Sequence, residues 1–213
     1  MGIVCMIMGA SGTGKSASLR NFDPTKVGVI NVAKKPLPFR SEIKTFNSDD
    51  YMEIEQVLKR AKAKSLVIDD SQYLMANEYM RRAGENGFQK FTDIGRNFWA
   101  LVNMCVDELP EDVIVYFLQH TETSDAGKEK AKTIGKLLDE KISLEGLFTI
   151  VLKTQVVDGR YMFSTQNNGQ DTVKTPMGMF SEPLIDNDLA MVDATIRDYY
   201  GIKEGKKNDK DAK

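Results

Sequence analysis

Apolar residues along this chain gather in short continuous runs that are separated by segments of helical periodicity. Four such runs have the length and composition of strands buried on both faces, as in a parallel sheet. They are Ile3–Met8, Val27–Val32, Ser65–Asp70 and Val113–Leu118. Strands that alternate with helices predict an α/β fold, in which a mostly parallel sheet is flanked by helices.

The segments between these runs carry apolar residues three or four positions apart, which predicts helices. One helix should follow Asp50 as its N-cap, and a longer helical stretch covers residues 71–108 with a break at residues 84–87. A final helix should have Asn187 as its N-cap and Gly201 as its terminator.

The pattern changes near the end of the chain to paired strands. Phe148–Gln155 and Arg160–Gln166 flank Asp158-Gly159, which is the strongest short hairpin signal in the sequence. We therefore expect a C-terminal antiparallel β-hairpin at one end of the sheet. Residues 1–202 should form one domain, and the charged residues 203–213 a disordered tail.

The composition suits one domain with a core of its own, since 41% of the 213 residues are hydrophobic and 28% are charged. No apolar run is long enough to cross a membrane, and no secretion signal precedes the first strand, so we expect a cytoplasmic protein without a membrane partner. Cys5 and Cys105 should be reduced core residues. The net charge of −2 attracts no nucleic acid overall, so such binding needs a local cluster or several copies.

Residues 9–16, Gly-Ala-Ser-Gly-Thr-Gly-Lys-Ser, follow the first strand and fit the phosphate-binding pattern G-x-x-x-x-G-K-[ST]. A triphosphate must meet inward-turned backbone N–H groups, and only residues without a Cβ let the chain come so close. A short helix should begin near Lys15 and stop at residues 21–24. The sequence thus predicts a nucleoside triphosphate as cofactor and leaves its base open, with ATP as the expected case. The binding residues would be Gly9, Ala10, Ser11, Gly12, Thr13, Gly14, Lys15, Ser16 and Ala17.

Four side chains concern the phosphates, the metal and the attacking water. Lys15 should reach the outer phosphates, while Ser16 offers a hydroxyl to Mg²⁺. Asp69, which ends a buried strand, is the acidic group that such an ion needs. Asp70 either orients or deprotonates the water or caps the next helix, and the sequence leaves both roles open.

The strand Val113–Leu118 should deliver Gln119 and His120 to the sheet edge that holds the phosphate loop. We expect Gln119 to sense the γ-phosphate. His120 is the single histidine of the sequence, so a loop imidazole is favoured over a metal ligand.

The next segment, Thr121–Lys136, is polar, lacks strong periodicity and should be mobile. In one interpretation its lysines are a solvated face, and in another they follow the backbone of a single-stranded nucleic acid. They are Lys128, Lys130, Lys132 and Lys136.

This order of parts resembles the RecA-like ATPase core over about residues 1–180, and more closely the phage nucleotide-binding proteins that include Sak-type single-strand annealing ATPases. The matching parts are the phosphate loop, the strand ending in Asp69 and Asp70, the strand ending in Gln119, the lysine-bearing segment and the hairpin leading to Lys174. The resemblance implies an ATPase that binds single-stranded DNA during phage recombination, in the cytoplasm of the host cell.

The resemblance also implies roles for single residues. Gln119 would couple the γ-phosphate to a DNA-binding loop at Thr121–Lys136, and Lys174 would reach the ATP of a neighbouring subunit. The active site would then be completed in a homo-oligomer, either a ring or a filament. A single-strand DNA-binding protein would be a further partner.

One departure from the family concerns hydrolysis. RecA proteins carry a catalytic glutamate after the strand that follows the phosphate loop, but here that strand ends Ile30-Asn31-Val32. Either Asp70 takes over water activation or hydrolysis is slow. Two other functions stay open: a nucleotide or small-molecule kinase, with Arg81 and Arg82 for its lid, and a nucleotide-switched replication loader.

Overall fold

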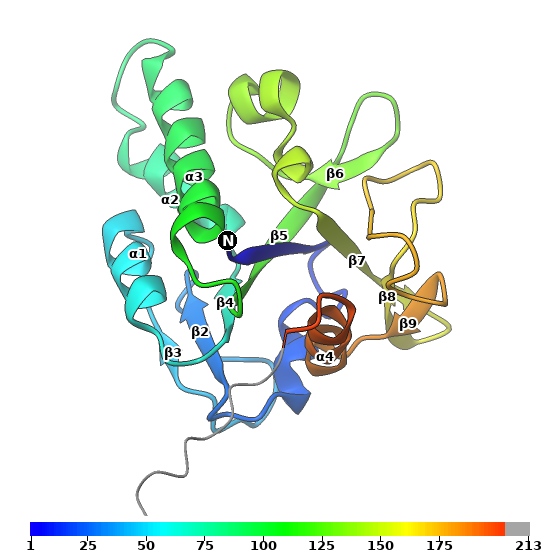
Figure 1. Cartoon of the computed structure of the whole chain (residues 1–213). Helices are drawn as coiled ribbons and strands as arrows, with labels where there is room; N and C mark the ends of the chain where they lie inside the picture. Colours follow the sequence, from blue (N-terminus) through cyan, green and yellow to red (C-terminus); the bar gives the residue numbers. More distant parts are fainter. Residues whose placement is uncertain (203–213) are drawn as a thin grey trace, which may run out of the picture.

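A computed structural model describes residues 1–202, without the side chains of residues 138–140, so the predicted tail lies outside the described residues. The centre of the fold is a nine-stranded sheet. Eight strands have the order β3-β2-β4-β5-β1-β7-β8-β9, and the ninth, β6, pairs with β5 (Figure 1). The strands are β1 (Ile3–Gly9), β2 (Val27–Asn31), β3 (Thr45–Phe46), β4 (Ser65–Asp69), β5 (Ile114–Thr123), β6 (Glu129–Ala131), β7 (Ile150–Val157), β8 (Arg160–Ser164) and β9 (Leu184–Asp186). The helices are α1 (Tyr51–Arg60), α2 (Gln72–Arg81), α3 (Gln89–Glu108), α4 (Leu189–Tyr199), the 3₁₀ helices η1 (Ser16–Asn21) and η3 (Leu144–Leu147), and the π-helix η2 (Leu137–Ile142).

The predicted mostly parallel sheet with flanking helices is confirmed. β1 runs parallel to β5 on one side and to β7 on the other, and β5 also runs parallel to β4. One strand, β5, therefore separates the phosphate-loop strand β1 from the acid-ended strand β4. Since these strands run in one direction, their carboxyl ends meet at the same edge of the sheet.

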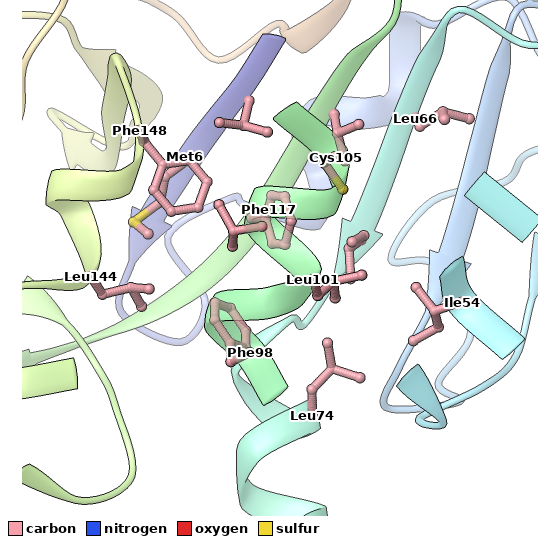
Figure 2. Packing of buried hydrophobic residues seen from close by; sticks show 14 of the residues in the cluster. Met6, Ile54, Leu66, Leu74, Phe98, Leu101, Cys105, Phe117, Leu144 and Phe148 are labelled. Carbon is pink, nitrogen blue, oxygen red and sulfur yellow. The ribbon is translucent and has the colours of Figure 1, made fainter. Parts of the chain in front are cut away.

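Side chains from alternate strand positions fill two cores, one on each face of the sheet. On one face, Met6 and Phe117 belong to a cluster with Phe98 of α3 and with Phe148 (Figure 2). The ring centroid of Phe117 lies 6.0 Å from that of Phe98 and 5.3 Å from that of Phe148. On the other face, Ile7 belongs to a cluster with residues of η1 and α4. Thus α1, α2 and α3 cover one face, and η1 and α4 cover the other.

Two expectations from the composition can be compared with the structure. Cys5 and Cys105 are both buried free thiols, as predicted. No helix within residues 1–202 is both long enough and apolar enough to cross a membrane.

β7 and β8 form the predicted antiparallel hairpin. Asp158 and Gly159 have φ angles of 49° and 75°, which is the pair of left-handed residues that a two-residue type I′ turn needs. The pairing continues from this turn to Lys153, opposite Ser164. Gly201, the predicted terminator of α4, also has a positive φ of 66°.

The N-cap of α4 is Asp188 rather than the predicted Asn187. The carboxylate of Asp188 accepts hydrogen bonds from the backbone N–H groups of Ala190 and Met191, at 3.0 and 3.2 Å. Asn187 is fully buried, and Arg20 donates to its backbone oxygen at 2.6 Å and to its Oδ1 at 3.3 Å. Both residue types favour N-caps, and only the burial of Asn187 decides between them.

Residues 121–136, predicted to be mobile, begin with a β-hairpin. β5 continues through Thr123, and β6 pairs with it antiparallel. Gly127 lies in the turn between them with φ of 76°. The sequence pattern did not predict this hairpin, although the alternating threonines of β5 favour a strand. The mobility of the segment stays a prediction.

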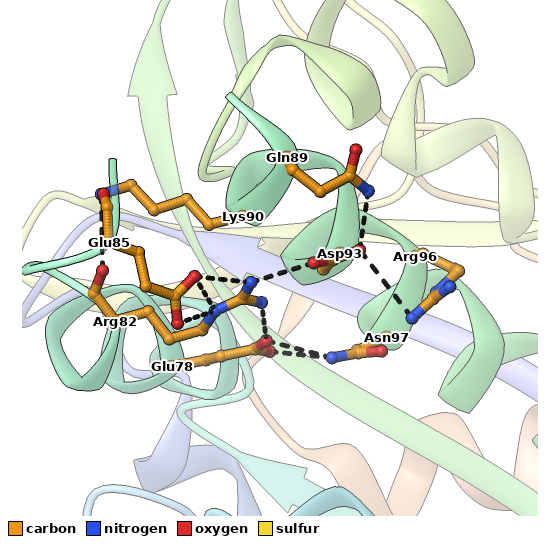
Figure 3. Close-up of polar contacts among 8 residues, drawn as sticks. All are labelled: Glu78, Arg82, Glu85, Gln89, Lys90, Asp93, Arg96 and Asn97. Atoms are coloured by element: carbon orange, nitrogen blue, oxygen red, sulfur yellow. Dashed lines mark hydrogen bonds and ion pairs between the residues drawn. The ribbon is translucent and has the colours of Figure 1, made fainter. Parts of the chain in front are cut away.

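A network of charges closes the turn between α2 and α3 (Figure 3). Nitrogens of the Arg82 guanidinium lie 3.1 Å from a carboxylate oxygen of Glu78, 2.8 Å from one of Glu85 and 2.9 Å from one of Asp93. The predicted break at residues 84–87 lies beside this network. Arg82 therefore links the end of α2, the turn and the start of α3.

A buried carboxylate attaches α4 to the sheet. Asp193 is 7% exposed and accepts hydrogen bonds from Ser65 Oγ at 2.8 Å, Tyr116 Oη at 2.9 Å and Arg197 Nε at 2.7 Å. Arg197 also donates to backbone carbonyls at the amino end of the sheet. Removal of the carboxylate would leave the guanidinium without its counter-charge.

We predict that Asp193→Ala lowers the free energy of unfolding by about 3–5 kcal/mol, because Arg197 loses its partly buried counter-charge. Asp186→Ala is the matched control, since its ion pair with Arg160 is exposed and should contribute less than about 1 kcal/mol. Urea denaturation followed by circular dichroism measures both. Equal losses in the two variants would contradict this account of α4.

Candidate functional site

The loop between β1 and η1, which was predicted to bind phosphate, contains two glycines with a left-handed backbone. Gly12 and Gly14 have φ angles of 79° and 100°, which residues with a Cβ adopt only under strain. A Cβ on Gly9 would collide with the hydroxyls of Thr154 and Thr13. These two hydroxyls are hydrogen-bonded to each other at 2.6 Å, which ties the loop to β7. Each of the three glycines is therefore needed.

Lys15 is buried in the hollow of this loop and is 6% exposed. Its Nζ donates to the carbonyl oxygens of Gly9 at 2.8 Å and Ala10 at 2.9 Å. Burial lowers the pKa of Lys15 to about 8, although the charges of Asp70 and Asp69 oppose this shift. An ammonium group is thus held at the place where an anion would enter the loop.

Ser16 and Asp69 lie together, although 53 positions separate them in the sequence. Ser16 Oγ donates to Asp69 Oδ1 at 2.8 Å. Burial raises the pKa of Asp69 to about 6, and the hydrogen bond from Ser16 opposes this rise. The structure therefore brings together the two residues predicted to hold a metal.

This pair offers oxygen ligands, which Mg²⁺ prefers, and a cation would offset the cost of burying the Asp69 carboxylate. Among the side chains that the structure describes, no group of three or more from histidine, cysteine, aspartate and glutamate could hold a metal ion. Mg²⁺ at nucleotide sites takes one or two carboxylates and completes its shell with waters and phosphates. Ser16 and Asp69 therefore fit an ion that arrives with a nucleotide.

Asp70 has a left-handed backbone with φ of 57°, and its side chain lies against β5. His120 Nε2 lies 3.2 Å from Asp70 Oδ1, and Lys35 Nζ lies 3.8 Å from Asp70 Oδ2. Burial would raise the pKa of Asp70, but the hydrogen bond and charge of His120, together with Lys35, hold the pKa below its ordinary value. The alternative role as a helix cap is not observed, because Ser71 is the N-cap of α2 and no side chain caps that helix.

Gln119 and His120 are successive residues of β5 and therefore point to opposite faces of the strand. Gln119 is fully buried: Ser71 Oγ donates to its Oε1 at 2.6 Å, and its Nε2 donates to the carbonyl of Lys132 at 2.6 Å. The predicted sensor therefore does not line the cavity at the phosphate loop, whereas His120 does. The parallel pairing of β1 with β5 places His120 beside Gly9, at the start of the phosphate loop. The strand register therefore explains why His120, and not Gln119, reaches the cavity.

The phosphate loop opens into a cavity of about 300 Å³. The loop forms one wall, and segments far apart in the sequence form the others. The lining residues are Ser11, Gly12, Gly14, Lys15, Ser16, Ala17, Lys35, Pro38, Asp70, Tyr73, His120 and Tyr161. The cavity thus combines the predicted loop, Asp70 and His120 with side chains whose place the sequence does not indicate.

Lys35 is one of the lining residues that sequence reasoning missed, since residues 33–40 resemble a solvated connector. Asn31 fixes its backbone: Asn31 Nδ2 donates to the Lys35 carbonyl at 2.5 Å, and the Lys35 N–H donates to Asn31 Oδ1 at 3.3 Å. The Lys35 ammonium lies 5.0 Å from the ring centroid of Tyr73, whose ring contacts His120 edge-on at 5.9 Å. Only the tertiary fold brings these residues together.

Other predicted site residues lie outside this cavity. Lys174 is exposed, and its backbone forms an antiparallel bridge with Val151 of β7. Lys130 Nζ lies 3.7 Å from a carboxylate oxygen of Glu122, so the lysines share the hairpin surface with acidic side chains. On or just after the β5–β6 hairpin lie Lys128, Lys130, Lys132 and Lys136.

The motifs that build this site are short: one loop and two carboxylates at the end of β4. No protein-family model and no curated protein matches the sequence. The function is therefore inferred from the chemistry of the site.

We predict that the affinity for ATP in the presence of EDTA falls as the pH rises above about 8. The pKa of Lys15 is lowered to about 8, so its charge is present below that pH and lost above it. The terminal phosphate of ATP titrates at about pH 6–7, as phosphate monoesters do, and keeps a constant charge above that range. The dissociation constant should then rise towards about tenfold per pH unit.

Isothermal titration between pH 7 and 9.5, in buffers of different ionisation enthalpy, measures both the affinity and the proton uptake. Lys44→Ala, which removes an exposed lysine away from the loop, should keep the wild-type profile. A flat profile in the wild type would show that the ammonium of Lys15 does not bind the anion.

Proposed function

We propose that this protein is a magnesium-dependent nucleoside triphosphatase with a RecA-like core and with ATP as its substrate. The observation that carries the proposal is the 2.8 Å hydrogen bond between Ser16 Oγ and Asp69 Oδ1. It joins a hydroxyl of the phosphate loop to a carboxylate two strands away in the sheet. A hydroxyl and a carboxylate placed in this way are the protein ligands of a nucleotide-bound Mg²⁺.

Catalysis would consist of positioning and charge neutralisation. Bound Mg²⁺ supplies positive charge to the phosphate oxygens. Lys15 exchanges the carbonyls of Gly9 and Ala10 for phosphate oxygens, so a cation that is already buried meets the anion. Backbone N–H groups of the loop surround the phosphates that this ammonium contacts.

Asp70 and His120 would orient the attacking water. Both line the cavity, and their side chains are 3.2 Å apart. The lowered pKa of Asp70 makes it a weak base, which suits orientation of the water better than early removal of its proton. A loose phosphoryl-transfer transition state needs little help from a base. The pair would thus take the place of the glutamate that is missing after β2.

The two arginines considered for the lid of a kinase are paired with carboxylates away from the cavity. Arg81 Nη1 lies 2.6 Å from Asp49 Oδ2, and Arg82 belongs to the carboxylate network between α2 and α3 (Figure 3). Neither arginine lines the cavity. The geometry therefore favours transfer of the phosphoryl group to water.

We further propose that the β5–β6 hairpin binds single-stranded DNA and that the protein acts in phage recombination. The support is the resemblance together with one connection: β5 carries His120 at the cavity, and Gln119 Nε2 donates to the Lys132 carbonyl just after β6. Lys174 is exposed, as contact with the nucleotide of a neighbouring subunit in a homo-oligomer requires.

We predict that Lys15→Ala lowers kcat/KM for ATP by at least about 100-fold, because the phosphates lose their buried cation. Asp70→Asn keeps the shape of the side chain but removes its charge, and it should lower kcat more than it raises KM. Thin-layer analysis of labelled ATP measures turnover and identifies the acceptor of the phosphoryl group.

Lys44→Ala should leave turnover unchanged, because this exposed lysine lies outside the cavity. Wild-type turnover in Lys15→Ala would remove the phosphate loop from the mechanism. Label on an acceptor other than water would favour a kinase.

A separate prediction concerns DNA. Replacement of Lys128, Lys130 and Lys132 with glutamine should weaken binding to single-stranded DNA and flatten the slope of log K against log salt by about 2. The same replacement of three lysines at the opposite end of the sheet is the matched control for net charge. Those residues are Lys59, Lys62 and Lys64. Fluorescence anisotropy over a salt series measures both variants, and equal slopes would exclude the hairpin as the contact.

A further inference from the structure

One aromatic residue in the cavity has no role in the chemistry proposed above. Tyr161 is the second residue of β8, and its side chain is half exposed (48%). It lines the cavity, and its ring touches the phosphate loop: a Cβ placed on Gly14 would lie 2.9 Å from ring atom Cδ1. An aromatic surface therefore lies open directly beside the loop.

The two sides of the phosphate loop differ in chemistry. On the side of β5 and β4 lie Asp70, His120 and Lys35, which suit a terminal phosphate and a water. Tyr73 lies on that side too, but Lys35 and His120 cover its ring. On the side of β7 and β8, Tyr161 presents its ring at Gly14.

We propose that Tyr161 is the platform on which the base of the bound nucleotide stacks. This inference rests on the proposed function, since it needs a nucleotide whose terminal phosphate points towards β4 and β5. The ribose and the base of that nucleotide leave the loop on its opposite side, where β8 presents Tyr161. Stacking on an aromatic ring raises affinity by about 5- to 100-fold and tolerates every base, because each base has a π-face.

The platform is preorganised by its neighbours. The backbone carbonyl of Tyr161 accepts a hydrogen bond from the N–H of Asn187 at 3.3 Å, and Tyr161 pairs across the hairpin with Val156. Asn187 is fully buried and is held by Arg20 of η1. Because the strand is fixed before the ligand arrives, little conformational entropy is lost when the base stacks.

A second observation concerns the contact between the phosphate loop and β8. Asn187 Nδ2 would lie 3.3 Å from a Cβ placed on Gly14, and this buried donor has no hydrogen-bond partner within residues 1–202. Buried donors without an acceptor are rare in proteins. Asn187 does not line the cavity, so this donor marks the contact between the loop and β8 and is not itself a ligand contact.

The test compares two ligands that share a polyphosphate, namely Mg·ATP and inorganic tripolyphosphate with Mg²⁺. We expect Tyr161→Ala to raise the dissociation constant for ATP by about 10- to 100-fold and to leave that for tripolyphosphate unchanged. Tyr161→Trp should keep the affinity for ATP. Tyr199→Ala, which removes a similarly exposed tyrosine (43%) from α4, should change neither constant.

Isothermal titration of both ligands separates the outcomes. If Tyr161→Ala weakens both ligands equally, or neither of them, the base does not stack on this ring and the inference is overturned while the proposed function stands. If the wild type binds neither ligand, the proposed function itself fails, and the inference fails with it.

Discussion

The parallel register of β1, β5 and β4 is the constraint on which the whole candidate site depends. It aligns Gly9 with His120 and brings the end of β4 within hydrogen-bond distance of the first helical residue after the loop. A slip of β5 by one residue would exchange His120 for Gln119 at the cavity and move every core residue of that strand to the opposite face. The two apolar cores prevent such a slip, so the packing of Phe117 and its neighbours also fixes the chemistry.

Two adjacent carboxylates, Asp69 and Asp70, lie in different environments and therefore suit different roles. Burial raises the pKa of Asp69 to about 6, whereas His120 and Lys35 hold the pKa of Asp70 below its ordinary value. The left-handed backbone of Asp70 sends the two side chains into different surroundings. Asp69 thus suits a cation that compensates its burial, and Asp70 is an ionised acceptor that is already paired. Environments that push two pKa values apart are a general way to assign different roles to like residues.

The sequence was sufficient wherever the physical cause is local. Apolar runs predicted the central strands, and the steric needs of Gly12 and Gly14 predicted the loop. The prediction failed where a residue from a distant part of the sequence determines the structure. The N-cap of α4 is an example: Asp188 caps the helix because Asn187 is buried against Arg20 and the core. The cavity residues Lys35, Tyr73 and Tyr161 come from three distant segments and leave no local signal.

The length of β5 has a mechanical consequence. Its inner part is held between β1 and β4, while its last residues pair only with β6 and project beyond the sheet (Figure 1). The strand therefore connects His120, which lies beside the phosphate loop, with the Gly127 turn through continuous extended backbone. A small rotation of β5 about the core would displace the Gly127 turn more than it displaces His120, because the turn lies farther from the core.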